Sequence, residues 1–199
     1  MTSMKTGGRA LHPSVEEILL SGDEIRVKVE ALGRQIADDY ADKRPIIVTT
    51  LKGAIIFASD LVRAIHPVPD GLEMGFVRAS SYGAGTKTSG KVVLGISTLK
   101  DEDIQGRHVL LVEDIVDSGN TAQALISHYQ SCGAASVAMA SLLSKPARRE
   151  VDFDPQYLCF TIPDKFVVGY GLDFAEHLRS LPYVGVLKPE AYSSPSEPE

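Results

Sequence analysis

The sequence predicts an α/β fold, in which a central, mainly parallel twisted β-sheet is flanked by helices. Short apolar runs alternate with segments of helical spacing, as expected when crossover helices join parallel strands. The apolar runs are continuous rather than alternating, which is typical of strands covered on both faces. The length of 199 residues suits one domain with a sizeable core, and we expect that domain to span residues 10–190.

The first expected elements are a helix, a strand and a second helix. Apolar residues recur at the spacing of one helix face between residues 25 and 36, after a turn-forming Ser-Gly-Asp run. Residues 45–51 are rich in apolar and β-branched side chains and are expected to form a buried strand, which a Lys-Gly pair ends. The helical pattern of residues 55–65 follows, and a nearby proline ends it.

A long polar segment separates the next two expected strands, at residues 72–79 and 91–98. This segment, residues 80–90, holds 11 residues and is rich in Gly. That is long for a hairpin connection, and long loops are often functional lids; a solvated connection is the alternative. The remaining expected elements are strands at residues 108–112, 136–143, 157–162 and 184–187 and a helix at residues 121–131.

The overall composition is that of an ordinary globular protein and argues against several classes. The net charge of -6 gives no general attraction to nucleic acid or to an anionic membrane. No apolar run approaches the roughly 18 residues of a transmembrane helix, and residues 1–9 lack the apolar core of a secretory signal. Cys132 and Cys159 are expected to be reduced thiols. We therefore expect a cytoplasmic protein, with flexible ends at residues 1–9 and 191–199.

The strongest motif is the stretch at residues 109–121, where an apolar strand delivers two adjacent acids at its end. A turn rich in small and hydroxyl residues follows and contains a third acid, and a helix then begins. In parallel sheets, ligands bind beyond the carboxyl ends of the strands. The adjacent acids are Glu113 and Asp114, the third acid is Asp117, and the turn continues through Ser118, Gly119, Asn120 and Thr121.

This arrangement indicates a site for a phosphate that is attached to a ribose. Free backbone N–H groups at a helix start, together with the helix dipole, hold a phosphate, and Gly119 lets the backbone come close. Ser118 and Thr121 add hydroxyl donors. Acids so close to a phosphate are useful only if the ligand also carries hydroxyl groups or a divalent cation. The alternative, in which Asp117 or Ser118 merely caps the helix, leaves the acid pair unexplained.

This stretch resembles the 5-phosphoribosyl-1-pyrophosphate signature of type I phosphoribosyltransferases in its strand, acid pair, third acid and turn. Ser118 stands where many members have Thr, and Asn120 stands where Lys is frequent; neither change removes a backbone donor. The resemblance implies the type I phosphoribosyltransferase fold, with a small hood formed by the chain ends. It also implies that residues 113, 114 and 117–121 bind phosphoribosyl pyrophosphate.

The segment at residues 163–179 bears on the choice of base. Phe166 can stack on a flat heterocycle, and a neighbouring strand-like backbone can read its edge. Asp173 is a hard oxygen ligand suited to magnesium, and Arg179 can clamp a phosphate. A core Phe and surface charges would explain this pattern about as well, so the residue types alone leave the base open.

The same segment resembles hypoxanthine-guanine phosphoribosyltransferases nearly residue for residue. The resemblance implies that Phe166 stacks on the purine and that the backbone at Val167 reads the ring edge, with Lys165 beside them in the purine site. It further implies that Asp173, also in the purine site, helps to bind magnesium, and that Arg179 contacts pyrophosphate.

Three further segments agree with this resemblance, which covers almost the whole folded chain. Lys52 and Gly53 resemble the family's pyrophosphate loop, where the peptide before the lysine can be cis. Ser81 and Tyr82 resemble a conserved pair in a mobile lid that also contacts phosphoribosyl pyrophosphate. Lys145 matches the lysine that donates to the purine 6-oxygen. Ordinary surface lysines are the alternative for Lys52 and Lys145.

The resemblance implies a purine-salvage enzyme that transfers the phosphoribosyl group to N9 of a 6-oxopurine, hypoxanthine or guanine. Magnesium is the implied cofactor, held by Glu113, Asp114 and Asp173. We expect Asp117 to act as the general base that takes the proton from purine N7 as N9 attacks. Family members are dimers or tetramers, so a homodimer or homotetramer is expected, with no nucleic-acid or membrane partner.

Two alternative functions remain open at this point. One is phosphoribosyl transfer to another base, such as xanthine, adenine or a pyrimidine; the segments around Lys145 and Phe166 argue against adenine and pyrimidines. The other is a nucleotide-binding regulator on the same fold that also binds RNA. Such a regulator would be expected to have a basic face, which the pI near 5.4 does not suggest.

Overall fold

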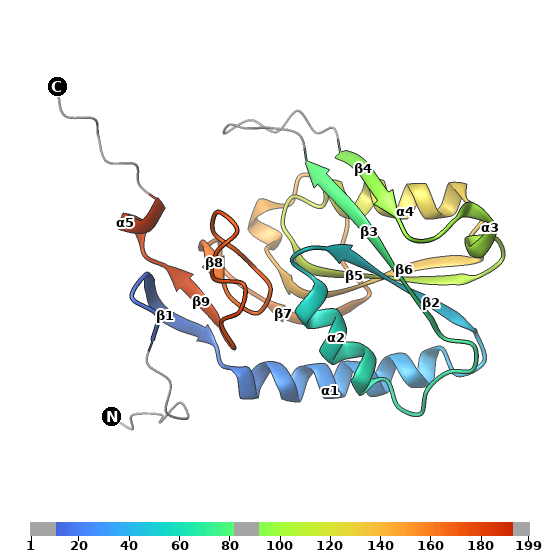
Figure 1. Cartoon of the computed structure of the whole chain (residues 1–199), viewed down its shortest axis with the longest axis horizontal. Helices are drawn as coiled ribbons and strands as arrows, with labels where there is room; N and C mark the ends of the chain where they lie inside the picture. The colour runs from blue at the N-terminus through green and yellow to red at the C-terminus, as the bar shows by residue number, and fades with distance from the viewer. Residues whose placement is uncertain (1–10, 82–91, 193–199) are drawn as a thin grey trace.

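The centre of the molecule is a six-stranded sheet, seen in a computed structural model that describes residues 11–81 and 92–192 (Figure 1). The strand order is β4-β3-β2-β5-β6-β7. Neighbouring strands are parallel except for β4, which pairs antiparallel with β3 at one edge. The mainly parallel sheet predicted from the sequence is therefore confirmed. The strands are β2 (Pro45–Leu51), β3 (Glu73–Ser81), β4 (Val92–Ser97), β5 (His108–Val116), β6 (Ser136–Ser144) and β7 (Tyr157–Thr161).

Helices cover both faces of this sheet. The first two, α1 (Gly22–Asp39) and α2 (Ile55–Ala64), lie on one face, and α4 (Asn120–Ser131) lies on the other (Figure 1). Side chains of β5 alternate between two cores: Leu110 packs with the residues of α1 and α2, while Leu111 packs with those of α4. Because both faces are buried, β5 is apolar without alternation in sequence. Among the described helices, none has the length and apolarity to cross a membrane.

A second, three-stranded sheet is built from segments near both ends of the described chain. Its order is β1-β9-β8, and both pairings are antiparallel. It has its own small cluster of buried side chains, including Val15, Val168 and Leu187. Figure 1 shows this sheet beside the main one, and it is built from segments near the chain ends, as expected for the hood. Its strands are β1 (Val15–Leu20), β8 (Val167–Val168) and β9 (Val184–Leu187).

One boundary matters for the site, because β5 is longer than the apolar run predicted. The strand continues to Val116, so Glu113 and Asp114 lie within it rather than after it. The extension is held by continued parallel pairing with β6, up to the pair Val116 and Ser144. Polar residues can lie within a strand when the neighbouring strand extends far enough to pair with them.

Several short elements were not predicted. These are β1, β8 and three single turns of helix. β8 and the turns have four residues or fewer, too few to show a periodic pattern, and in β1 the adjacent Glu16 and Glu17 interrupt the apolar run. The last turn includes Ala191 and Tyr192, which lie inside the stretch expected to be a flexible end. The turns are α3 (Asp101–Ile104), a 3₁₀ turn (Pro146–Arg148) and α5 (Pro189–Tyr192).

Helix α1 packs against α2 through a glycine. At its start, the Glu24 N–H donates to the Ser21 hydroxyl at 3.3 Å, and the Ser21 N–H donates to the Glu24 carboxylate at 2.8 Å, a reciprocal cap. Further along, Gly33 lies against the last residue of α2, so that a Cβ there would be 2.5 Å from the Ala64 carbonyl oxygen. This close backbone approach sets the position of α2 against the sheet.

We expect Gly33→Ala to destabilise the protein, because the new Cβ has no room unless α2 moves. Overpacking costs about 1–3 kcal/mol, and the better helix propensity of Ala offsets only about 0.5–1 kcal/mol. The free energy of unfolding in urea should therefore fall by about 1–2 kcal/mol. Gln35→Ala, at an exposed position of the same helix, should change it by less than about 0.5 kcal/mol. Equal stability of the two variants would show that the contact is not tight.

Candidate active site

The turn between β5 and α4 forms a polar cradle at the carboxyl end of β5. Gly119, directly before α4, has a φ of 89°, in the left-handed region that glycine adopts most readily. Because this residue is a glycine, it provides no side chain to cap the start of α4. A cavity of about 70 Å³ opens here, and Glu113, Asp117, Ser118 and Thr121 line it. The turn that the sequence predicts to hold a phosphate thus forms a concavity at a helix start, and phosphate binding there stays a prediction.

The cradle is fixed from behind by Arg149. Its guanidinium donates to the carbonyl oxygens of Val116 at 3.1 Å and Asp117 at 2.5 Å, and to the Ser144 hydroxyl at 2.7 Å. The side chain is only 12% exposed, so these bonds are shielded from water. Charge-assisted bonds of this kind are stronger than neutral ones. Arg149 therefore determines the path of the backbone that carries Asp117.

The next residue along the chain supports the same turn from a second side. The Glu150 N–H donates to the Ser118 carbonyl oxygen at 2.9 Å. Its carboxylate accepts a bond from the Asn120 side-chain amide at 2.6 Å. The segment that follows β6 is thus a brace for the cradle.

Glu113 and Asp114 are close together and shielded from water. Glu113 is 6% exposed, and burial, with the nearby Asp114 charge, raises its pKa well above the usual value. Burial raises the pKa of Asp114 to about 6, although the Ile115 N–H, which donates to this carboxylate at 2.9 Å, acts to lower it. Ionised carboxylates in such surroundings favour a ligand that brings positive charge or hydroxyl donors.

The loop after β2 lies directly against the acid pair. Gly53 approaches so closely that a Cβ there would be 1.7 Å from a carboxylate oxygen of Asp114. A second cavity, of about 210 Å³, is lined by both residues together with Glu113 and Thr121. The Leu51–Lys52 peptide bond before this loop is cis. The structure thus brings together the Lys52-Gly53 loop and the acid pair of β5, although Gly53 and Glu113 are 60 residues apart in sequence.

Arg179 and Lys52 bring positive charge to the same edge. Arg179 donates to the Gly171 carbonyl oxygen at 2.9 Å and lies 2.9 Å from a carboxylate oxygen of Asp173. One carboxylate oxygen of Glu176 lies 3.1 Å from Arg179 and 3.1 Å from the Lys52 ammonium. The Arg179 charge also lowers the pKa of Asp114, and the Asp173 charge raises it. Arg179, Lys52 and the neighbouring acids therefore influence one another through their charges.

Lys145 lies at the end of β6 and is largely buried, with 9% of its side chain exposed. Its ammonium is 3.7 Å from a carboxylate oxygen of Asp164. Arg148 is 3.6 Å from the same oxygen and 2.8 Å from a carboxylate oxygen of Asp117. A chain of four alternating charges therefore connects Lys145, expected to read the base, with Asp117, expected to move the proton.

Phe166 is partly exposed and surrounded by aromatic rings. Its ring stacks on Tyr192 with centroids 5.3 Å apart and meets the edge of Phe174 at 5.8 Å. Val167 follows in β8 and is buried. The Lys165 ammonium donates to Glu17 of β1 at 2.6 Å, and this bond raises the pKa of Lys165. Within the described residues, the Lys165 ammonium thus pairs with β1 of the small sheet.

Some expected site residues remain without a structural test, and others were missed. Ser81 ends β3, and Tyr82, with the rest of the expected lid, lies outside the described residues. Sequence reasoning missed the contributions of Arg148, Asp164 and Glu176. The Arg pair at residues 148 and 149, shortly after Lys145, was a possible signal, but Asp117, which pairs with Arg148, lies 31 positions away in sequence.

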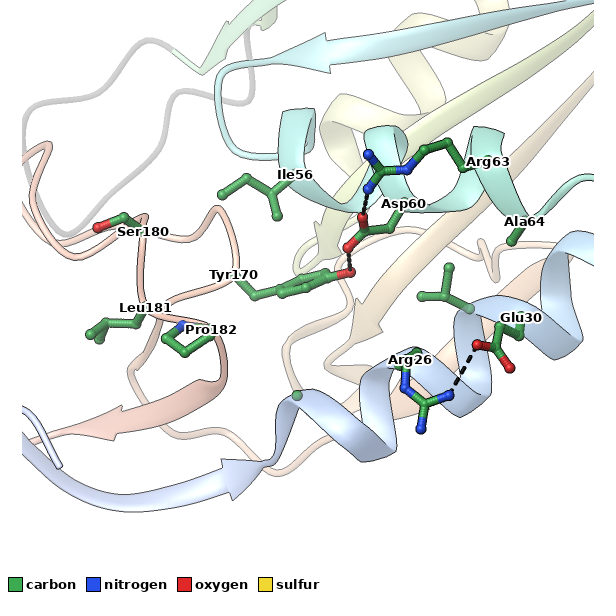
Figure 2. A pocket seen from close by; sticks show the side chains of 12 residues that line it. Arg26, Glu30, Ile56, Asp60, Arg63, Ala64, Tyr170, Ser180, Leu181 and Pro182 are labelled. Atoms are coloured by element: carbon green, nitrogen blue, oxygen red, sulfur yellow. Dashed lines mark hydrogen bonds and ion pairs between the residues drawn. The ribbon is translucent and has the colours of Figure 1, made fainter. Parts of the chain in front are cut away.

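A larger cavity lies outside this site. It measures about 570 Å³, and Figure 2 shows it between α1, α2 and the segment that includes Tyr170 and Leu181. The Tyr170 hydroxyl donates to Asp60 at 2.5 Å across it. No residue expected in the active site lines it, and its lining is mainly apolar, so we place the chemistry at the smaller polar cavities.

The site and fold agree with a known family. Residues 16–175 match the model of the phosphoribosyl transferase domain. The chain belongs to the phosphoribosyltransferase family.

Named relatives extend this similarity over nearly the whole chain. A hypoxanthine-guanine phosphoribosyltransferase of Streptococcus pneumoniae is 48% identical over 184 residues, which are 92% of this chain and 99% of that protein. One from Bacillus subtilis is 43% identical, covering 90% of this chain and 97% of that protein. A hypoxanthine phosphoribosyltransferase structure from Staphylococcus aureus has a TM-score of 0.85 at 38% identity, covering 94% of this chain and 99% of its own.

We expect Arg149→Met to loosen the cradle without unfolding the sheet. Each charge-assisted bond that is lost contributes about 1.5–3 kcal/mol, so the amides of residues 118–121 should exchange with solvent roughly 10- to 100-fold faster. Hydrogen exchange followed by mass spectrometry measures this. Arg34→Met, at an exposed position of α1, should leave exchange at 118–121 unchanged. Equal protection in both variants would mean that Arg149 does not hold the turn.

Proposed function

We propose that this chain is a purine-salvage enzyme that transfers the 5-phosphoribosyl group from 5-phosphoribosyl-1-pyrophosphate to N9 of hypoxanthine or guanine. The products are IMP or GMP and pyrophosphate. The observation that carries the proposal is that the cradle of α4, the acid pair of β5 and the cations Lys52 and Arg179 meet at one edge of the sheet. The similarity to the S. pneumoniae and B. subtilis enzymes supports this choice of reaction.

The three parts of the site match the three parts of the donor. The N–H groups and hydroxyls of residues 117–121 suit the 5-phosphate. Glu113 and Asp114 suit the ribose hydroxyls, because carboxylates accept hydrogen bonds from a diol. Lys52 and Arg179 suit the diphosphate, which leaves with a high negative charge. Gly53, which packs against Asp114, suits close approach of the backbone to the same group.

The candidate ligands for magnesium are Glu113, Asp114 and Asp173, whose carboxylate oxygens suit this ion, and one or two of them would hold it beside waters and substrate oxygens. The Asp173 charge raises the pKa of Asp114, so a cation between them would relieve repulsion. Within the described residues, no group of three or more His, Cys, Asp or Glu side chains converges on one point. Magnesium commonly keeps several waters and binds substrate oxygens beside one or two carboxylates. When bound, it would neutralise charge on the leaving diphosphate.

The purine would lie between Phe166 and the charged chain that ends at Asp117. Lys145 would donate to the 6-oxygen, because an ammonium has donors only. Asp117 would accept the N7 proton as N9 attacks the sugar. In the free protein, Arg148 lies 2.8 Å from the Asp117 carboxylate, so purine binding would require this ion pair to open. Exclusion of water around the reacting sugar would protect it from hydrolysis.

The proposal includes the cytoplasmic location and the homodimeric or homotetrameric state expected from the sequence. A structure of hypoxanthine phosphoribosyl transferase from Trypanosoma cruzi, with a TM-score of 0.84 at 38% identity over 92% of this chain and 97% of its own, was studied for its oligomeric state. That similarity supports testing self-association by analytical ultracentrifugation.

A single assay tests the proposed reaction. Hypoxanthine, guanine, xanthine, adenine and uracil are offered in parallel with phosphoribosyl pyrophosphate and magnesium, and nucleotide formation is followed by chromatography. We expect IMP and GMP, with no product in excess chelator. Nucleotide from adenine or uracil alone, or full activity without magnesium, would overturn the proposal.

We expect Asp117→Asn to lower kcat by about 10²–10⁴-fold, the usual cost of removing a general base. Asn keeps the size of the side chain, so binding of phosphoribosyl pyrophosphate, measured by calorimetry, should change little. Asp152→Asn, at an exposed position after the brace, serves as the control and should keep normal turnover. Near-normal turnover of the Asp117 variant would show that another group takes the proton.

We expect Lys145→Gln to weaken discrimination between bases. The three donors of Lys145 satisfy a 6-oxygen but oppose the amino donor of adenine, whereas Gln offers both a donor and an acceptor. A site built around one hydrogen bond can reject the wrong analogue by up to about 10⁴-fold. The kcat/KM for hypoxanthine and guanine should fall, and the gap to adenine should narrow. Lys28→Gln, on an exposed face of α1, should retain the original discrimination, and full discrimination in the Lys145 variant would remove its proposed role.

A further inference from the structure

A carboxylate of the protein itself pairs with the two cations that we assign to diphosphate. One oxygen of Glu176 lies 3.1 Å from the Lys52 ammonium and 3.1 Å from the Arg179 guanidinium. These cations come from segments 127 residues apart in sequence, and Glu176 bridges them. A single oxygen shared by two cations is the arrangement that a bridging phosphate oxygen would also adopt.

The backbone that presents Glu176 is a tight turn with unusual geometry. Phe174 and His177 exchange two backbone hydrogen bonds, at 3.1 and 2.9 Å. Between them, Ala175 and Glu176 have φ values of 49° and 68°, in the left-handed region that residues with a Cβ adopt at a cost. The Glu176 N–H also donates to the Asp173 carboxylate at 2.8 Å. Such strain is maintained where surrounding contacts fix it and is often found at binding sites.

The contact is better explained by the binding of an anion than by stability of the fold. Both side chains of the Lys52–Glu176 pair are more than 60% exposed, and exposed ion pairs contribute little to stability. The same pair places a negative charge where an incoming anion must bind. The two cations also lower the pKa of Glu176, so its carboxylate stays ionised in their presence.

We propose that Glu176 is an internal counter-ion of the diphosphate subsite, which bridges Lys52 and Arg179 in the free protein and is displaced when diphosphate binds. This inference rests on the proposed function, which assigns the two cations to diphosphate. Two consequences follow from the geometry. Glu176 competes with the anion for the same donors, and once displaced it stays close to that anion on a short turn. Both effects lower the affinity for pyrophosphate and favour its release as product.

The proposal predicts an effect that depends on the ligand. Pyrophosphate must displace Glu176, whereas a nucleoside 5′-monophosphate would occupy the cradle and the base site and leave Glu176 paired with the two cations. Removing the charge at position 176 should therefore tighten pyrophosphate binding and leave monophosphate binding unchanged. If Glu176 had a purely structural role, its replacement would weaken the binding of both ligands or of neither.

Binding of magnesium pyrophosphate and of IMP to the full chain is measured by calorimetry for the original protein, Glu176→Gln and Glu176→Asp. We expect Glu176→Gln to bind pyrophosphate about 3- to 10-fold more tightly, the range for loss of one exposed ion pair and its repulsion. IMP should bind equally well. Glu176→Asp keeps the charge on a shorter side chain and should lie between the two.

The control is Glu30→Gln. Glu30 also forms an exposed ion pair with an arginine at 3.1 Å, with Arg26 on α1 (Figure 2), and this change alters the net charge equally. It should leave the affinity for pyrophosphate unchanged. Equal tightening in Glu30→Gln and Glu176→Gln would overturn the inference, because the effect would then be one of overall charge.

Two other outcomes are distinguishable. If the original protein binds pyrophosphate and Glu176→Gln binds it equally or more weakly, the inference is wrong and the proposed function stands. If neither protein binds pyrophosphate or IMP, the proposed function fails and the inference fails with it. Circular dichroism of each variant verifies that the fold is retained.

Discussion

The parallel pairing of β5 with β6 is the constraint on which the site depends. It continues past the apolar part of β5 to Val116 and Ser144, so that two acids lie inside a sheet covered on both faces. Burial then raises the pKa of Glu113 and of Asp114. Beyond this point Arg149 binds the carbonyl oxygens of the turn and the Ser144 hydroxyl, which ties the end of one strand to the end of the other. The position of the cradle is thus fixed by the ends of two paired strands.

The free site is a set of opposite charges that satisfy one another. Arg148 pairs with Asp117, and Glu176 pairs with Lys52 and Arg179. An acidic protein with a net charge of -6 can therefore present cations to a polyanionic substrate without a basic surface. Each internal pair is partly exposed and weak, so a ligand that carries several charges can replace them. The cost of this arrangement is a lower affinity than a fully unpaired site would have.

Local motifs were predictable, whereas contacts between distant segments were not. The cradle lies within one stretch of sequence, so the strand, the acids, the glycine and the helix start follow one another along the chain. The brace by Arg149 joins residues 32 and 33 positions apart, and the contact of Glu176 with Lys52 joins residues 124 apart. Lys165 was expected in the purine site, but its ammonium bonds Glu17, 148 positions away. Residue types alone do not reveal such partners, because many charges of the right sign are available.

The sequence by itself determined the class of fold and the cradle between β5 and α4, because apolar periodicity and helix-start chemistry act over a few neighbouring residues. Its likeness to known enzymes also predicted that Lys145, Phe166 and Asp173 belong to the site. Only the tertiary structure decided how far β5 extends and which charges neutralise which. Those outcomes depend on the pairing of strands and on side chains that meet across more than a hundred residues. Their energies are set by burial and distance, which no linear pattern contains.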